Sequence, residues 1–177
     1  NDISRANATS YNCSSTLTGI YSYYTYATSR ATTLDGNNLH DWPYAGASTS
    51  SAPSTVTVFN LSYNYGNATN RFSTSGNTIK NIFATSNMYL GNNNYNYYFD
   101  LNNNFADNND VTVSSSSSYN FYGWYNGYTY GSYRFNGNTI QNCDGGYYWY
   151  GIRNYYPQSV NGVQEINYNI IQNNIKS

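Results

Sequence analysis

Few residues in this chain have the type and spacing of a catalytic site. His40 is the only histidine and lies beside Asp41, but the strained Gly-x-Ser-x-Gly turn that would support a serine nucleophile is absent. A glycosidase needs two carboxylates about 5 to 10 Å apart. Glu165 is the only glutamate, and the aspartates are scattered, mostly in turn contexts. We therefore predict no enzymatic activity, no catalytic residues, no metal site and no cofactor.

A group of aromatic residues near the C-terminus has two open interpretations. Tyr147, Trp149, Tyr150 and Tyr155 could form a flat platform that stacks on the rings of surface glycans. They could instead pack in the core and between subunits, which we favour because the chain has few other large apolar residues. Stacking on bases is disfavoured, because the sequence has no basic groove to hold phosphates.

The two cysteines, Cys13 and Cys143, are far apart and do not have a metal-ligand spacing. In an exported protein, one pair of cysteines can persist as a disulfide. We predict a bridge between Cys13 and Cys143. Two buried free thiols are the alternative.

Four Asn-x-Ser/Thr sequons are candidate glycosylation sites, at Asn7, Asn12, Asn60 and Asn67. Their number is not informative in a chain so rich in Asn, Ser and Thr. Asn60 alternates with Phe59 and Leu61, which places it on the solvent side of a predicted strand. Asn67 follows in a predicted turn. We expect both of these asparagines to be accessible to a glycan.

The composition limits what the chain can bind. It has 177 residues with a net charge of -1, only 8% of them charged, and 24 of them are tyrosines. So little positive charge excludes binding along a nucleic-acid backbone. No window approaches 18 apolar residues, so we expect no membrane insertion. Because the chain starts at Asn1 without an apolar leader, we expect a mature exported protein or an excised piece, located at the cell surface.

Strand signals dominate the sequence, and helix signals are almost absent. Runs of Tyr, Thr, Val, Ile and Phe alternate with clusters of Asn, Gly and Asp. This spacing predicts one antiparallel β-sandwich, immunoglobulin-like or jelly-roll, over residues 16–177, preceded by an N-terminal extension at 1–15. Asn126-Gly127, between aromatic runs, predicts a tight type I′ hairpin. The predicted strands are 17–28, 55–65, 77–84, 95–102, 110–115, 119–125, 128–135, 147–153 and 163–172.

A parallel β-helix is the alternative architecture. Residues 71–81 and 134–142 both begin with Arg-Phe and continue to Gly-Asn-Thr-Ile, which is either a duplicated hairpin or a coincidence. One such pair is too little to predict a solenoid. The tail at 166–175 alternates Ile with Asn, and it could form one rung of a β-helix with an Asn at the turn.

The low charge favours a protein that assembles with copies of itself. Net charge and charged edge strands are the usual protection against association, and both are missing here. An unpaired terminal segment can add as a strand to a neighbouring subunit. The candidate donor strand is 1–15, in which Ile3, Ala6 and Ala8 are the apolar residues that enter the neighbour. Such head-to-tail addition produces a fibre when it does not close.

Part of the chain resembles known surface proteins. Residues 98–102, 110–113, 119–122 and 125–131 resemble the strand, Asn-rich loop, strand and hairpin of immunoglobulin-like domains in exported archaeal surface proteins. The Asn/Tyr/Ser/Thr bias is similar to subunits of archaeal extracellular threads and pili built by strand donation. The resemblance implies a β-sandwich, glycosylation and a structural or adhesive role. Adhesin-like β-helix proteins of microbial surfaces share the bias, through residues 137–142 and 166–175.

The leading prediction is a non-enzymatic, glycosylated subunit of an extracellular filament, a homopolymer assembled by strand donation. The first alternative is a cell-surface adhesin module that binds glycans. The second is a viral capsid or spike domain.

Overall fold

The computed structural model describes residues 1–4, 16–26, 29–43, 52–111, 119–158 and 162–174. These residues form strands and no helix, so the predicted all-β class is confirmed. The strands are β1 (Asp2–Ser4), β2 (Thr16–Tyr23), β3 (Thr32–Thr33), β4 (Asn38–Trp42), β5 (Thr55–Ser62), β6 (Phe72–Ser73), β7 (Thr78–Ala84), β8 (Asn87–Asn94), β9 (Asn96–Asp100), β10 (Phe105–Asp107), β11 (Asp110–Val111), β12 (Asn120–Arg134), β13 (Thr139–Gln141), β14 (Tyr148–Gln158), β15 (Gln164–Glu165) and β16 (Ile170–Gln172).

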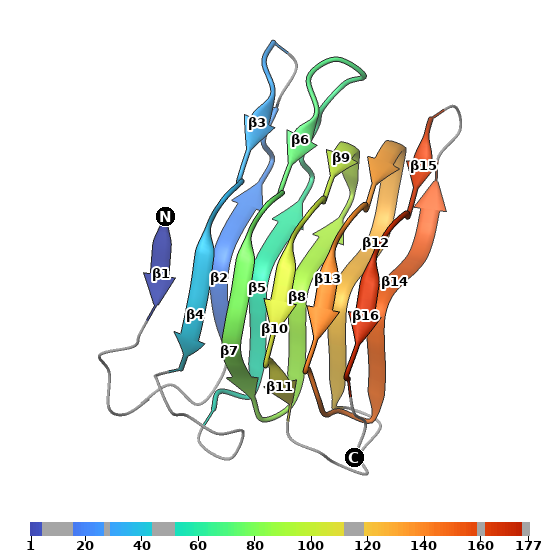
Figure 1. Cartoon of the computed structure of the whole chain (residues 1–177). Coiled ribbons are helices and arrows are strands. Elements are labelled where there is room, and N and C mark those ends of the chain that lie inside the picture. The colour runs from blue at the N-terminus through green and yellow to red at the C-terminus, as the bar shows by residue number, and fades with distance from the viewer. Residues whose placement is uncertain (5–15, 27–28, 44–51, 112–118, 159–161, 175–177) are drawn as a thin grey trace.

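The strands form two parallel sheets that face each other (Figure 1). The first sheet has the order β1-β4-β7-β10-β13-β16, with β11 also paired to β7. The second sheet runs β2-β5-β8-β12-β9-β6-β3, and β14 and β15 pair with β12. The chain rises through a strand of the second sheet, bends, descends through the first sheet and then repeats the path. Each such circuit is one rung, and β14, β15 and β16 form the last rung.

The predicted antiparallel β-sandwich is therefore wrong, in both its immunoglobulin-like and its jelly-roll form. The parallel pairing fits the β-helix alternative. The Asn and Gly clusters that resembled hairpin turns are bends that carry the chain from one sheet to the other. Because every rung bends in the same sense, equivalent strands lie side by side and parallel. Ile79 pairs with Leu39 on one side and with Ala106 on the other.

The predicted hairpin at Asn126-Gly127 is also absent, because both residues lie inside the continuous strand β12. Asn126 is buried, and its side chain accepts a hydrogen bond from Asn93 and donates one to Asn154 on the next rung, at 2.7 Å. Gly127 lies so close to the Asn94 side chain that a Cβ would overlap it. The Asn-Gly pair therefore serves contacts between rungs rather than a turn.

The hydrophobic core lies between the sheets and is built of columns that run from rung to rung. In the first sheet, Leu39, Ile79, Ala106 and Ile140 follow one another in register and are fully buried. In the second sheet, Val56, Met88 and Phe121 form an equivalent column. Stacking like on like buries each apolar side chain against two neighbours, which a single rung cannot do alone.

A column of asparagines marks the bend that leads into the first sheet, and we call it the asparagine column. From Asn37 onward, each member follows a residue in the left-handed region of φ, for example Gly76 before Asn77 and Gly137 before Asn138. The side-chain oxygen of one member accepts hydrogen bonds from the backbone nitrogen and the side-chain nitrogen of the member on the rung before it. Asn104 Oδ1 accepts in this way from Asn77, at 3.0 and 2.9 Å. Its members are Asn1, Asn37, Asn77, Asn104, Asn138 and Asn169.

The asparagine column explains the repeated Gly-Asn-Thr-Ile pattern. Gly76-Asn77-Thr78-Ile79 and Gly137-Asn138-Thr139-Ile140 occupy the same bend on two different rungs. The rung between them has Asn103 and Asn104 at the first two positions, so the sequence identity is lost there while the backbone conformation is kept. The pattern is therefore a structural repeat and not a coincidence.

Candidate functional site

Stacked tyrosines cover the outer corner that follows the strands of the second sheet. In one column, the centroids of neighbouring rings lie 4.8 to 5.2 Å apart, and the rings are nearly parallel except for Tyr128 and Tyr156, whose planes are inclined by 51°. A second column has spacings of 4.8 to 5.0 Å. The first consists of Tyr24, Tyr63, Tyr95, Tyr128 and Tyr156, and the second of Tyr26, Tyr65, Tyr97 and Tyr130.

The sequence places these rings through a repeated Tyr-x-Tyr triplet. In Tyr63-Asn64-Tyr65 the two rings point outward, while Asn64 is fully buried and contacts Asn96 of the next rung at 2.9 Å. Tyr63 adopts a positive φ of 55°, which bends the chain at this point. These columns were not predicted from the sequence, although the recurrence of Tyr-x-Tyr is a signal for them.

A third stack lies on the outer face of the second sheet. Tyr89 and Tyr122 stack at 4.6 Å, and Tyr122 and Tyr150 at 5.2 Å. The Arg153 guanidinium lies over the Tyr150 ring at 4.7 Å and over the Tyr155 ring at 5.1 Å. Burial, followed by the neighbouring tyrosines, raises the pKa of Tyr89 to about 12. Burial likewise raises the pKa of Tyr122, so Tyr89 and Tyr122 are neutral packing elements at physiological pH.

The four residues of the predicted glycan platform do not share one face. Trp149 stacks on Phe121 at 5.3 Å and packs against the core, whereas Tyr150 stacks on the outer face. Adjacent residues of one strand point to opposite sides of the sheet, which accounts for the division. Tyr147 contacts Tyr148 edge-on, and Tyr155 lies beneath Arg153. The part of the platform available on the outside is therefore tyrosine and arginine.

Two of the predicted glycosylation sites lie among the described residues. Asn60 is on β5, half-buried, and its side-chain oxygen accepts from Asn92 at 3.4 Å. Asn67 Oδ1 accepts hydrogen bonds from the backbone nitrogens of Thr69 and Asn70, at 2.9 and 2.7 Å. Asn7 and Asn12 lie outside the described residues.

The predicted disulfide is wrong, because Cys143 is a free and fully buried thiol. Its partner in that prediction, Cys13, lies outside the described residues. Cys143 stands in a corner column where other rungs have asparagine, between Asn109 and Asn174, and its backbone nitrogen donates to Asn174 Oδ1 at 2.8 Å. Its thiol donates to the Gln141 carbonyl at 3.1 Å. Cys143 therefore has a place in the rung stack and not in a bridge.

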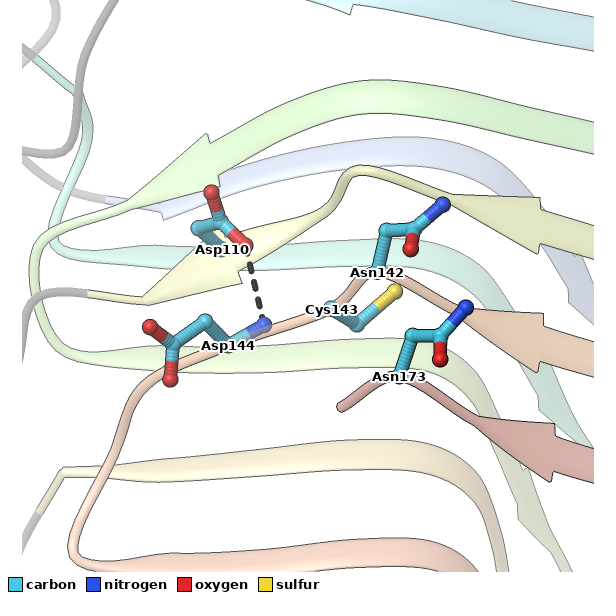
Figure 2. A pocket seen from close by; sticks show the side chains of 5 residues that line it. All are labelled: Asp110, Asn142, Cys143, Asp144 and Asn173. Carbon is cyan, nitrogen blue, oxygen red and sulfur yellow. Dashed lines mark hydrogen bonds between the residues drawn. The ribbon is translucent and has the colours of Figure 1, made fainter. Parts of the chain in front are cut away.

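A hollow of about 220 Å³ lies beside Cys143 at one end of the first sheet (Figure 2). Asp110, Asn142, Asp144 and Asn173 form the rest of its lining, and Asp110 Oδ1 accepts from the Asp144 backbone nitrogen at 2.9 Å. Burial raises the pKa of Asp110 to about 6 and that of Cys143 to about 12. Among the described residues no group of three His, Cys, Asp or Glu side chains could hold a metal.

The two ends of the β-helix are open within the described residues. At the N-terminal end, β1 pairs with β4 of its own chain, and Ile3 packs partly against the core. Ala6 and Ala8, the other residues of the predicted donor strand, lie outside the described residues. At the C-terminal end, β16 pairs only with β13, and β14 pairs only with β12. The last rung leaves four aliphatic side chains 43 to 50% exposed: Val163, Ile166, Ile170 and Ile171.

His40 holds β1 against the first sheet. Its Nε2 lies 2.8 Å from Asp2 Oδ1 on β1, and its Nδ1 lies 2.6 Å from Asp41 Oδ2. The hydrogen bond to Asp41, and then that to Asp2, raises the pKa of His40, although burial acts in the opposite direction. His40 thus has a structural role, since it bridges two carboxylates at the edge of the sheet.

Comparison with protein-family models, with curated proteins and with solved structures found no match to this chain. In the part of the chain that the structure describes, no helix is long and apolar enough to span a membrane. The candidate functional surfaces are therefore defined by geometry alone: the tyrosine columns and the open last rung.

Proposed function

We propose that this protein is a non-enzymatic structural subunit of an extracellular surface and that it assembles with copies of itself through the ends of its β-helix. The observation that carries the proposal is the last rung, whose strands pair only with β12 and β13 among the described residues and whose aliphatic side chains are about half exposed. Solenoid ends are normally closed by polar caps, because an open edge with apolar side chains promotes association.

The composition supports the same proposal. Arg153 is the only charged residue on β14, Glu165 is the only one on β15, and β16 carries none. A neutral edge gives little repulsion between copies. Parallel strand addition across the edge would pair backbone groups along the rung, which is the physical basis of strand addition between subunits. The extracellular location and the glycans at Asn60 and Asn67 belong to this proposal.

The test is the assembly state of the full chain. We expect sedimentation velocity and negative-stain images to show polymers that grow with protein concentration. Ile166→Asp places a charge on the exposed apolar surface and should strongly reduce assembly. Asn167→Asp, at the neighbouring exposed position, adds the same charge away from the apolar contacts and should leave assembly unchanged.

Circular dichroism and thermal unfolding must show that both variants fold like the parent chain. A parent chain that stays monomeric at high concentration would contradict the proposal. Assembly that is insensitive to Ile166→Asp would contradict the role of the last rung.

Glycan binding by an adhesin module is a second candidate, favoured by the tyrosines of β14. Tyr148, Tyr155 and Tyr156 are each about half exposed on a strand that has no neighbour beyond it among the described residues. An exposed ring face is what stacking on a sugar requires. Binding on a glycan array that is lost in Tyr156→Ala and kept in Tyr65→Ala, inside a stacked column, would favour this function.

A further inference from the structure

We infer that the copies join head to tail, with β1 of one copy added to β16 of the next, so that the columns of the first sheet continue from one molecule into its neighbour. This inference rests on the proposed function, and it specifies which surfaces meet and in which register.

The asparagine column has a direction. Asn1 Nδ2 donates to Asn37 Oδ1 at 2.8 Å, and Asn37 Nδ2 donates to Asn77 Oδ1 at 3.0 Å. The same sense continues to the last rung, where Asn138 Nδ2 donates to Asn169 Oδ1 at 3.0 Å. Each asparagine thus accepts from the rung before it and donates to the rung after it.

The two ends of this column are complementary. Asn169 uses its oxygen for Asn138 and one amide hydrogen for the Phe135 carbonyl, at 2.7 Å, so its second amide hydrogen has no acceptor among the described residues. Asn1 donates to Asn37, and its Oδ1 has no donor among the same residues. One end therefore offers a donor and the other an acceptor. Two identical ends would face donor to donor or acceptor to acceptor, which disfavours a symmetric contact.

The register of the first sheet brings two isoleucines together where β1 of one copy meets β16 of the other. Ile3 aligns with Leu39, and Ile171 aligns with Ile140 in the same inward column. If Asn1 follows Asn169, then Ile3 follows Ile171. Adding one more strand at the usual spacing of about 4.8 Å would bury Ile171, which is 47% exposed, against another isoleucine.

The second sheet adds no direct contact at this junction. β2 lies on the same rung as β4, one rung after β1, so Leu17 of one copy lies two rungs from Trp149 of the other, and Tyr24 lies two rungs from Tyr156. Among the described residues, the junction is therefore formed by the first sheet.

The charges permit this contact. Asp2 is the only charged residue of β1, and it faces β16, which has none. The neighbouring strand of the second sheet, β2, also has no charged residue. No like charges meet when the N-terminal end of one copy stacks on the C-terminal end of another.

Disulfide trapping tests the register. In a Cys13→Ser background, Ile3→Cys and Ile171→Cys would bring two Cα atoms of neighbouring copies within the 4.4 to 6.8 Å that a disulfide spans. Cys143 can stay, because it is buried. We expect the double variant to form a series of covalent multimers on non-reducing gels. The matched control, Ile3→Cys with Gln172→Cys, directs one thiol to the opposite face of β16 and should form none.

Three outcomes would overturn the inference. Covalent dimers of the Ile171→Cys single variant would show that identical ends meet. Polymers of the double variant without disulfides would leave self-assembly intact but reject this register. A parent chain that does not polymerise would reject the proposed function together with the inference.

A second measurement does not depend on thiol chemistry. Ile171→Glu and Ile3→Lys should each raise the protein concentration needed for polymerisation by at least about tenfold. The double variant, which carries both changes in one chain, should recover assembly, because the two new charges are opposite and meet only in the head-to-tail register. Failure of the double variant to recover, with both single variants folded, would also count against the inference.

Discussion

Asparagines at the bends combine two roles that few other residues can fill together. Among the described residues, eleven other than glycine have positive φ, and six of these are asparagine or aspartate, which tolerate this conformation better than other side chains. The Asn81 carboxamide, for example, donates to Asp41 on one neighbouring rung and accepts from Asn108 on the other. The backbone strain of each bend is thereby offset by hydrogen bonds that only a stack of similar rungs can provide.

Asn77 allows the strength of this arrangement to be measured. It is almost fully buried, it accepts from the backbone and side-chain nitrogens of Asn37, and it donates to Asn104. Asn77→Ala leaves buried donors of Asn37 without an acceptor, so we expect the free energy of unfolding to fall by about 2 to 4 kcal/mol. Urea unfolding would measure the change. Asn92→Ala, on the solvent side of β8, is the control and should alter stability by less than about 0.5 kcal/mol.

Cys143 provides a second prediction at the scale of a single residue. Burial raises the pKa of its thiol to about 12, so the thiolate that reacts with alkylating agents is almost absent at neutral pH. We expect Cys143 to resist iodoacetamide in the native protein and to react fully in denaturant, with peptide mass spectrometry separating it from Cys13. Rapid labelling of the native thiol, or its recovery as a disulfide, would contradict the buried free thiol.

At the scale of elements, the short strand β1 depends on the protonation of His40. The imidazole lies between Asp2 and Asp41, with Lys80 as its register neighbour on β7. The folded-state pKa of His40 is raised above 6.5. Its stabilising contribution is therefore complete below about pH 6.5 and is lost as the pH rises through the higher folded value.

We expect hydrogen exchange at β1 to become faster as the pH rises above about 6.5 and through the higher folded-state pKa of His40, after correction for the intrinsic rate. His40→Gln keeps a polar side chain without a titrating charge, so the corrected exchange rate of β1 should be independent of pH in this range. A β1 whose protection is the same in both proteins at every pH would show that the two carboxylates do not anchor the strand.

The strands were easier to predict from sequence than their partners. Alternation placed the strand at 55–65 close to β5 (Thr55–Ser62), and it placed Asn60 on the outer side. It could not reveal that 119–125 and 128–135 are one strand, because Asn126-Gly127 has the same sequence whether it turns or stacks on Asn93 and Asn154. Turn chemistry is local, whereas the contacts that override it come from neighbouring rungs.

At the scale of the whole molecule, the prediction failed on strand direction. Residues such as Gly76 and Asn77 mark a bend in either an antiparallel or a parallel fold, so composition alone favoured the more common sandwich. The full Gly-Asn-Thr-Ile repeat occurs at only two rungs, because Asn38-Leu39 follows Gly36-Asn37 on a third rung and Asn103 and Tyr168 replace the glycine on two others. The candidate surfaces were missed for the same reason, since they exist only once the rungs are stacked.

All side-chain hydrogen bonds of the asparagine column run in the same direction, so the number of rungs in this protein can change without disturbing them. An internal asparagine of the column accepts a hydrogen bond from one neighbouring rung and donates one to the other, as Asn104 does. An extra circuit inserted between two rungs would therefore meet the same complementary faces as the original neighbours. Duplication or loss of a whole circuit would then lengthen or shorten the molecule without redesign of the rest. Partial circuits would shift every column out of alignment, and selection is expected to remove them.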